Sequence, residues 1–178
     1  MNKEEFSSVL FLDRDGVINE DFGYVHKVSD FKFKEGVINL LKALSKKSFA
    51  LIIITNQSGI GRGYYRHSDF EKLNNWMINT LLEKKINLID VFYCPHAPES
   101  NCECRKPKPG MLLEAIKKYN IDVDRAWMLG DNETDIIAAN NAGINKTILI
   151  TNESKHIESR AAWVVSSTSR IADILDNG

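Results

Sequence analysis

Near its start the chain reads Val9-Leu10-Phe11-Leu12-Asp13-Arg14-Asp15-Gly16, four apolar residues followed by two carboxylates with one residue between them. Consecutive apolar residues are typical of a strand that helices cover on both faces, as in a parallel sheet. Asp13 and Asp15 would then point to the same side where the strand ends. A hard cation such as Mg2+, with oxygen ligands, would offset the cost of desolvating them. The alternative is a solvated turn, because Asp and Gly are common turn residues.

Four further apolar runs of strand length follow along the chain, at residues 50–54, 89–93, 126–129 and 147–150. The segments between and after them carry helical signals: an apolar stripe from Val37 to Leu44, a capping box of Ser68 and Glu71, Pro109 in a first turn, residues 134–142 before Gly143, and an apolar pattern over 171–175. Strands that alternate with helices predict an α/β, Rossmann-like fold of three layers with a mainly parallel central sheet. Ligands of such folds bind beyond the carboxyl ends of the strands.

The composition argues against several classes of protein. Of 178 residues, 43% are hydrophobic and 26% are charged, which is typical of one globular domain over residues 1–178. The formal net charge of −1 leaves no basic excess for binding a nucleic acid. No apolar run is long enough to cross a membrane, and the charged N-terminal residues lack the apolar region of a signal peptide. We therefore expect a cytoplasmic monomer without nucleic-acid or membrane partners.

Polar segments follow two more of the predicted strands. Thr55-Asn56-Gln57-Ser58-Gly59 offers a hydroxyl, amides and backbone N–H groups, which suit phosphate oxygens. Gly130-Asp131-Asn132-Glu133-Thr134-Asp135 returns acidic residues to the same edge of the sheet. Arg105 and Lys106 form a compact positive pair before a predicted helix. Taken singly, each segment is also compatible with ordinary turn or surface chemistry.

The order of these segments resembles the haloacid dehalogenase (HAD) phosphatase superfamily over roughly residues 9–150. The resemblance implies that Asp13 is the nucleophile and that Asp15 is the general acid and base. It further implies that Thr55 and Lys106 hold the phosphoryl group, and that Mg2+ is bound by Asp13, Asp15 and Asp131. About 37 residues separate the first strand from the second, and we expect no large cap domain because a loop and a helix take up much of that length.

A second constellation lies at about residues 94–104, where all three cysteines of the chain and one histidine fall together. Cys94, His96, Cys102 and Cys104 are a full tetrahedral ligand set for Zn2+. With every position taken by the protein, such a site would be structural and would support a zinc-binding loop. The alternative is three free thiols and a surface histidine.

The zinc loop narrows the resemblance to a branch that contains D-glycero-D-manno-heptose 1,7-bisphosphate 7-phosphatases and histidinol-phosphate phosphatases. The segments at residues 21–25, 55–63 and 104–112 are similar to the heptose enzymes. In that reading the substrate is a small phosphorylated sugar that loses its C7 phosphate through an aspartyl-phosphate, in the nucleotide-heptose pathway to lipopolysaccharide or surface polysaccharide precursors. The resemblance implies these substrate-binding residues: Asp21, Phe22, Gly23, Tyr24, Asn56, Gln57, Ser58, Arg105 and Asn132. The family commonly has Lys at the position of Asn132, so a charged contact to the substrate is weakened or replaced here.

Three alternatives remain at this stage. The compact spacing from His96 to Cys102 is also similar to histidinol-phosphate phosphatases, which act in histidine biosynthesis. A zinc-stabilised binding module without catalysis is a different class of function, but all five catalytic positions of the resemblance are filled. A polynucleotide 3′-phosphatase is disfavoured by the net charge and by the lack of an extended basic stripe.

Overall fold

The computed structural model describes residues 6–151 and 158–177, and within them the chain forms one six-stranded sheet. The strand order is β3-β2-β1-β4-β5-β6, and every neighbouring pair is parallel. The strands are β1 (Ser8–Leu12), β2 (Phe49–Asn56), β3 (Leu88–Cys94), β4 (Ala126–Gly130), β5 (Lys146–Ile150) and β6 (Trp163–Val165). The predicted parallel α/β sheet is confirmed.

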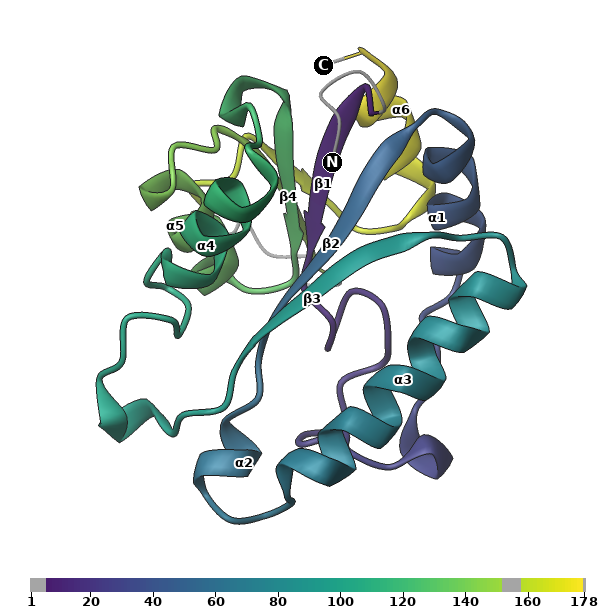
Figure 1. Ribbon diagram of the computed structural model, residues 1–178. Helices are drawn as coiled ribbons and strands as arrows, with labels where there is room; N and C mark the ends of the chain where they lie inside the picture. The colour runs from purple at the N-terminus through teal and green to yellow at the C-terminus, as the bar shows by residue number, and fades with distance from the viewer. Residues whose placement is uncertain (1–5, 152–157, 178) are drawn as a thin grey trace.

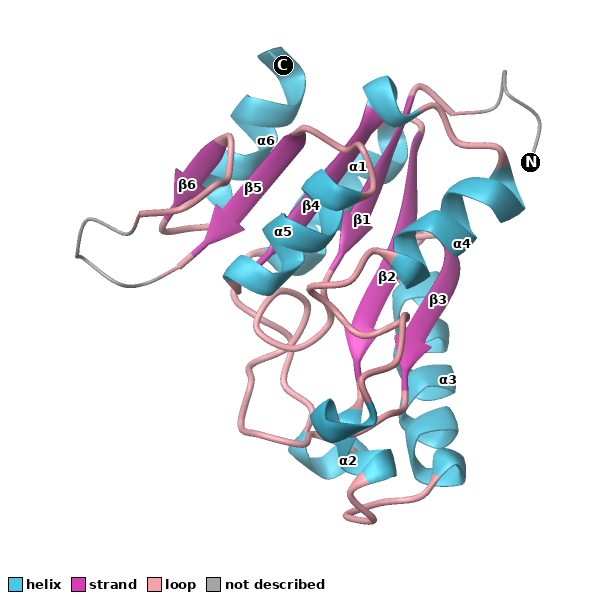
Figure 2. Ribbon diagram, turned by 90° about the vertical axis from the view of Figure 1, so that its left-hand side faces the viewer, coloured by secondary structure: helices cyan, strands magenta, loops and turns pink. Residues whose placement is uncertain are grey.

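Helices cover both faces of the sheet and make three layers (Figures 1 and 2). One face carries α1 (Val37–Lys46), α3 (His67–Glu83) and α6 (Ser169–Asn177), and the other carries α4 (Gly110–Tyr119) and α5 (Glu133–Asn141). The short helix α2 (Ser58–Gly61) follows β2, and single 3-10 turns lie at Val28–Asp30, Pro98–Ser100 and Val123–Arg125. Between β1 and β2 the chain holds only loops, one 3-10 turn and α1, so there is no large cap domain.

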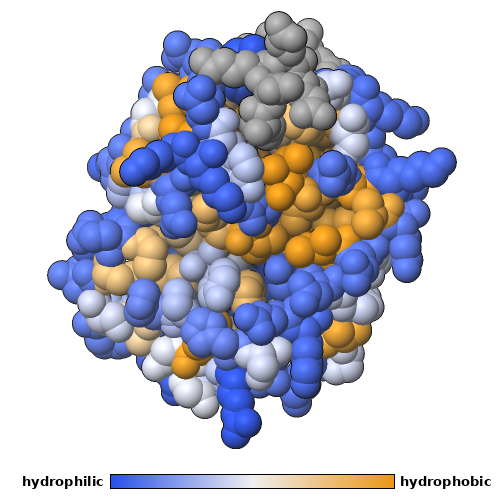
Figure 3. All heavy atoms as spheres, viewed as in Figure 1, coloured by the Kyte–Doolittle hydropathy of each residue, from blue (hydrophilic) through white to orange (hydrophobic). Residues whose placement is uncertain are grey.

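The two hydrophobic cores explain why the strands are apolar at consecutive positions. In β1, Leu10 and Leu12 pack into the core under α1, α3 and α6, while Val9 and Phe11 pack into the core under α4 and α5. Side chains of a strand alternate between faces, so a strand with helices on both sides buries every residue. The edge strand β3 is only partly covered. Figure 3, in the view of Figure 1, shows apolar residues at the surface across the middle of the molecule.

The strand order places the ends of β1 and β4 at the centre of the sheet. The chain winds outward through β2 and β3 on one side of β1 and through β5 and β6 beyond β4 on the other. Parallel sheets of this order bind ligands where the direction of winding reverses, beyond the carboxyl ends of the two central strands. Asp13 follows β1 and Asp131 follows β4, so both residues lie at that point.

The structure corrects one helix start and adds two short elements to the sequence prediction. Helix α3 begins at His67, and Asp69 Oδ2 accepts a hydrogen bond from the Arg66 N–H at 2.9 Å, in place of the predicted pair of Ser68 and Glu71. Strand β6 and helix α2 were not predicted, because three or four residues are too few to show a period. Among the described residues, no helix combines the length and the apolar character needed to cross a bilayer.

Candidate active site

Three carboxylates meet beyond the two central strands. Asp13 comes from the end of β1, Asp131 from the end of β4 and Asp135 from the first turn of α5, and one oxygen of each lies within 4.8 Å of the others. Gly16, with φ of 80°, allows the loop after Asp15 to approach closely, because a Cβ at this position would overlap the Asp131 carboxylate. The local backbone is therefore built around this acidic group.

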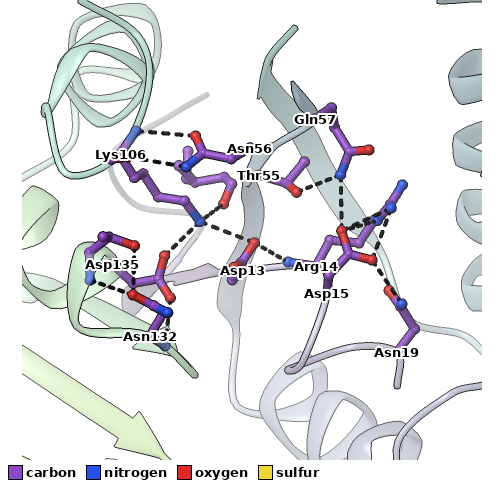
Figure 4. A network of polar contacts seen from close by, with 12 residues as sticks. Asp13, Arg14, Asp15, Asn19, Thr55, Asn56, Gln57, Lys106, Asn132 and Asp135 are labelled. Carbon is purple, nitrogen blue, oxygen red and sulfur yellow. Dashed lines mark hydrogen bonds and ion pairs between the residues drawn. The ribbon is translucent and has the colours of Figure 1, made fainter. Parts of the chain in front are cut away.

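Lys106 brings a positive charge into the same group. Its Nζ lies 3.0 Å from Asp13 Oδ1 and 2.7 Å from Asp135 Oδ1, and it donates to the Ile54 carbonyl oxygen at 2.7 Å (Figure 4). Burial lowers the pKa of Lys106, but the two carboxylates raise it further, so the net shift is upward and the side chain stays charged. Asn56 holds the Lys106 backbone by accepting from its N–H at 3.1 Å and donating to its carbonyl oxygen at 3.2 Å.

The electrostatics of this group fit a divalent cation. Burial is the largest cause that raises the pKa of Asp13 to about 8, with Asp135, Asp15 and Asp131 adding to it and Lys106 opposing it. Burial and the neighbouring Asp135 raise the pKa of Asp131 to about 6. Three carboxylates against one ammonium leave two negative charges in excess when all are ionised. Oxygen ligands and this charge suit Mg2+.

Asp15 has a different environment from the one expected for a metal ligand. Its carboxylate accepts hydrogen bonds from the Arg14 guanidinium, with Nη2 at 2.9 Å from both oxygens, from Asn19 Nδ2 at 2.9 Å and from Gln57 Nε2 at 3.0 Å (Figure 4). These donors turn the carboxylate away from the three-carboxylate group. The group of clustered acids contains Asp13, Asp131 and Asp135, whereas the carboxylate of Asp15, which the resemblance gives as a further Mg2+ ligand, lies outside it.

The expected phosphate-binding residues line one pocket with these acids. The pocket has a volume of about 320 Å³, and its lining includes Asp13, Asp15, Thr55, Lys106 and Asp131. Asn56, Gln57 and Ser58 continue the lining along the segment after β2. The structure thus brings together the four predicted catalytic side chains at the carboxyl edge of the sheet.

The loop after β1 and the segment before α4 form the outer wall of the pocket. Asp21, Gly23 and Tyr24 line it, and the Asp21 carboxylate accepts from the Gly23 N–H at 2.8 Å. Phe22 is 66% exposed and is not part of the lining. Arg105 also lines the pocket, and its Nη1 is buried without a hydrogen-bond partner among the described residues.

The four predicted zinc ligands lie together in the loop between β3 and α4. Cys104 Sγ is 3.1 Å from Cys94 Sγ, 3.4 Å from Cys102 Sγ and 3.2 Å from His96 Nδ1. Tetrahedral zinc would set such atoms about 3.5–3.8 Å apart. The thiols form no disulfide, and all four ligand atoms fall within 4.8 Å of one another. The cluster is therefore compatible with one Zn2+.

The predicted zinc loop contacts the elements that carry the predicted phosphate-binding residues. The Gly61 N–H, at the end of α2, donates to the Pro95 carbonyl oxygen at 2.8 Å. At the other end of the loop, a Cβ on Gly110 would overlap the Glu103 carbonyl oxygen, so the start of α4 packs directly on the loop. Lys106 lies two residues after Cys104. The loop therefore connects the segment after β2 to the segment that delivers Lys106.

Comparison with known proteins identifies the family. The HAD-hydrolase-like family model matches residues 103–177. A D-glycero-β-D-manno-heptose-1,7-bisphosphate 7-phosphatase from Helicobacter pylori is 47% identical over 146 residues, covering 82% of this chain and 84% of that protein. The enzyme of the same name from Escherichia coli is 41% identical over 168 residues, covering 89% of this chain and 88% of that one. The chain belongs to the HAD-like phosphatases.

A solved structure supports the same assignment. The D,D-heptose 1,7-bisphosphate phosphatase of B. bronchiseptica, complexed with magnesium and phosphate, superimposes with a TM-score of 0.85 at 27% sequence identity. The match covers 94% of this chain and 97% of that chain. The present phosphatase is thus a phosphoric monoester hydrolase.

Asn132 has a structural use in this phosphatase besides its place in the pocket lining. Its side-chain oxygen accepts from the Thr134 N–H at 3.0 Å and caps α5, while its own N–H donates to Asp135 Oδ2 at 3.1 Å. A lysine could not accept the first of these bonds. The asparagine therefore fixes the turn that presents Asp135 to Asp13.

Sequence reasoning assigned no role to three residues that shape the site. Asp135 was visible as the second aspartate after Gly130, and its spacing on the first turn of α5 could have suggested its position. Arg14 is buried and supports Asp15, although a charged residue between two acids in a sequence usually indicates a solvated position. Tyr65 is buried and contacts Gln57, a partner that only the fold reveals.

Proposed function

We propose that this phosphatase removes the phosphate at C7 of D-glycero-β-D-manno-heptose 1,7-bisphosphate. The observation that carries the proposal is the pocket in which Asp13 and Lys106 lie at the base and Arg105 lies on the wall. The relatives from Helicobacter pylori and Escherichia coli, which are named for this substrate and this anomer, support it.

The first half of the reaction forms a bond between the enzyme and the phosphoryl group. An Asp13 carboxylate oxygen attacks phosphorus, the bond from phosphorus to the C7 oxygen breaks, and Asp15 gives its proton to the leaving oxygen. Lys106 and the Thr55 hydroxyl hold oxygens of the transferred group. Asp13 and Asp131, together with Asp135, would hold Mg2+, which when bound supplies charge that offsets the repulsion between the phosphate and Asp13.

The second half restores the enzyme. Asp15, now ionised, takes a proton from a water molecule whose oxygen attacks the aspartyl-phosphate, and the bond from Asp13 to phosphorus breaks to release inorganic phosphate. The donors around Asp15 hold its carboxylate in one orientation at the pocket wall, from which it can reach a water molecule.

The second phosphate of the substrate would give Arg105, on the wall of the pocket, a binding partner. The buried Arg105 Nη1 has no partner among the described residues, and a charge-assisted bond to the phosphate at C1 would satisfy it. A monophosphate cannot supply this binding energy, so the bisphosphate gains in kcat/KM. We infer that the reaction takes place in the cytoplasm, in the nucleotide-heptose pathway to lipopolysaccharide or surface polysaccharide precursors.

The test is phosphate release from a panel of three substrates in the presence of Mg2+: both anomers of the heptose bisphosphate and histidinol phosphate. We expect the highest kcat/KM with the β anomer and no turnover by Asp13→Asn, which lacks the nucleophile. Higher kcat/KM with histidinol phosphate would overturn the substrate assignment. Substantial activity of Asp13→Asn would overturn the mechanism, and a folded wild-type protein that releases no phosphate from any substrate would favour the binding module.

A further inference from the structure

A buried chain of hydrogen bonds leads from Asp15 through Gln57 to Tyr65, a tyrosine that also lines the pocket. Gln57 Nε2 donates to Asp15 Oδ2 at 3.0 Å and to Thr55 Oγ1 at 2.9 Å. At its other end, Gln57 Oε1 accepts from the Tyr65 hydroxyl at 2.7 Å. Gln57 is 2% exposed and Tyr65 is 6% exposed, so water does not compete freely for these bonds.

The chemistry of the partners explains the orientation of the Gln57 amide when Asp15 is ionised, the form that takes the proton from water. An ionised carboxylate can only accept, so the amide turns its N–H2 group toward it. The amide oxygen then faces the hydroxyl of Tyr65, which must donate. Burial raises the pKa of Tyr65 to about 12, so the hydroxyl keeps its proton. The opposite orientation would set two acceptors against each other and would leave the Asp15 carboxylate with fewer donors.

Packing fixes the ring of Tyr65 without help from its hydroxyl. The ring stacks on His26 with centroids 4.8 Å apart and planes within 4° of parallel. It also packs against the backbone of Gly59, where a Cβ would overlap the ring. A phenylalanine would keep both contacts, so replacement of the tyrosine removes the hydrogen bond alone.

We propose that Tyr65 is a positioning residue that acts through Gln57 to hold Asp15 in place for proton transfer. The proposal rests on the proposed function, because Asp15 is the proton-transferring group of that reaction. Without the hydroxyl, the Gln57 amide can rotate, and its bonds to Asp15 and Thr55 are made for a smaller fraction of the time. Lys106, which holds the phosphoryl group in the proposed reaction, has no part in this chain of hydrogen bonds.

The test compares Tyr65→Phe with Tyr64→Phe, a matched loss of a hydroxyl from the neighbouring exposed tyrosine. The probe is p-nitrophenyl phosphate, which does not depend on the sugar specificity. We expect Tyr65→Phe to lower kcat about 3- to 10-fold, the scale of one hydrogen bond, with KM unchanged. Tyr64→Phe should equal the wild type. In a Gln57→Ala background, Tyr65→Phe should have no further effect, because the two residues act in one chain.

A second measurement does not depend on turnover. NMR of the Gln57 side-chain amide should show faster hydrogen exchange in Tyr65→Phe than in the wild type, and unchanged exchange in Tyr64→Phe. Wild-type kcat in Tyr65→Phe, an equal loss in the Gln57→Ala background, or unchanged Gln57 exchange would each overturn the proposal. If Asp13→Asn remains active, the proposed function fails instead, so the two failures can be told apart.

Discussion

Lys106 shows how a single buried residue can hold a charge that would otherwise be costly. Its side chain is 2% exposed, and its ammonium contacts two carboxylates and one backbone carbonyl. The pairing offsets the desolvation of the lysine, but burial, together with the neighbouring carboxylates, still raises the pKa of Asp13 and of Asp131. A cation bound among these acids would offset that cost.

Replacement of this lysine tests both roles. Lys106→Met keeps much of the apolar stem but leaves Asp13 and Asp135 without their nearest positive charge. We expect kcat to fall about 100-fold or more, as for loss of one donor to the transition state. The free energy of unfolding should fall by about 3–5 kcal/mol, as when one partner of a buried pair is removed. Phosphate release and urea unfolding measure the two quantities.

The control is Lys108→Met, two residues further along. Lys108 forms an ion pair with Glu103, whose side chain is 87% exposed, and such pairs contribute about 0–1 kcal/mol. Its replacement should leave kcat within a few-fold of the wild type. If Lys106→Met behaved like Lys108→Met, Lys106 would have no part in holding the phosphoryl group.

At the scale of elements, the loop between β3 and α4 has little regular secondary structure to define its path. Its only regular element is the 3-10 turn Pro98–Ser100, and most residues from His96 to Glu103 are exposed. Cys94 ends β3 and is buried, while Cys104 lies just before Arg105 and Lys106. A metal that joins these residues would fix the segment that positions Lys106.

We therefore expect protein purified without added metal to contain about one zinc per chain, bound by the four-ligand cluster. Removal of this zinc by a strong chelator should lower both the Tm and the phosphatase activity, since the Lys106 segment loses its anchor. Cys102→Ser should lose the zinc, whereas His67→Ala, a change to an exposed histidine outside the loop, should keep it. Elemental analysis decides, and absence of zinc together with three freely titratable thiols in the folded protein would contradict the assignment.

The elements that were predicted well from the sequence are those whose signal is local. Five strands were predicted because their residues are apolar on both faces, and α1 was predicted from its stripe of Val37, Leu40, Leu41 and Leu44. The start of α3 was predicted wrongly because Ser68 is a common N-cap residue and Arg66, the residue that the structure uses, is not. The hydrogen bond from Gln57 to Asp15 and the one from Tyr65 to Gln57 join residues 42 and 8 positions apart, which no local pattern reveals.

At the scale of the whole molecule, the site lies where the two directions of the sheet meet. Asp13 belongs to the side that continues through β2 and β3, and Asp131 with Asp135 belongs to the side that continues through β5 and β6. The repulsion among the three carboxylates therefore acts between β1 and β4, the two central strands. A divalent cation at this point would turn that repulsion into a link across the centre of the fold.

We accordingly expect Mg2+ to stabilise the whole protein. A ligand at 100 times its Kd stabilises the folded state by about 2.7 kcal/mol, which for a chain of this size is a rise in Tm of about 5–10 °C. Asp131→Asn should lose most of this rise, because it removes one ligand from the β4 side. Asp124→Asn, which alters an exposed acid far from the pocket lining, should keep it. Thermal unfolding with Mg2+, and with Na+ at equal ionic strength, measures the effect. An equal rise with Na+, or in Asp131→Asn, would mean that Mg2+ acts on the surface and does not join the two sides of the sheet.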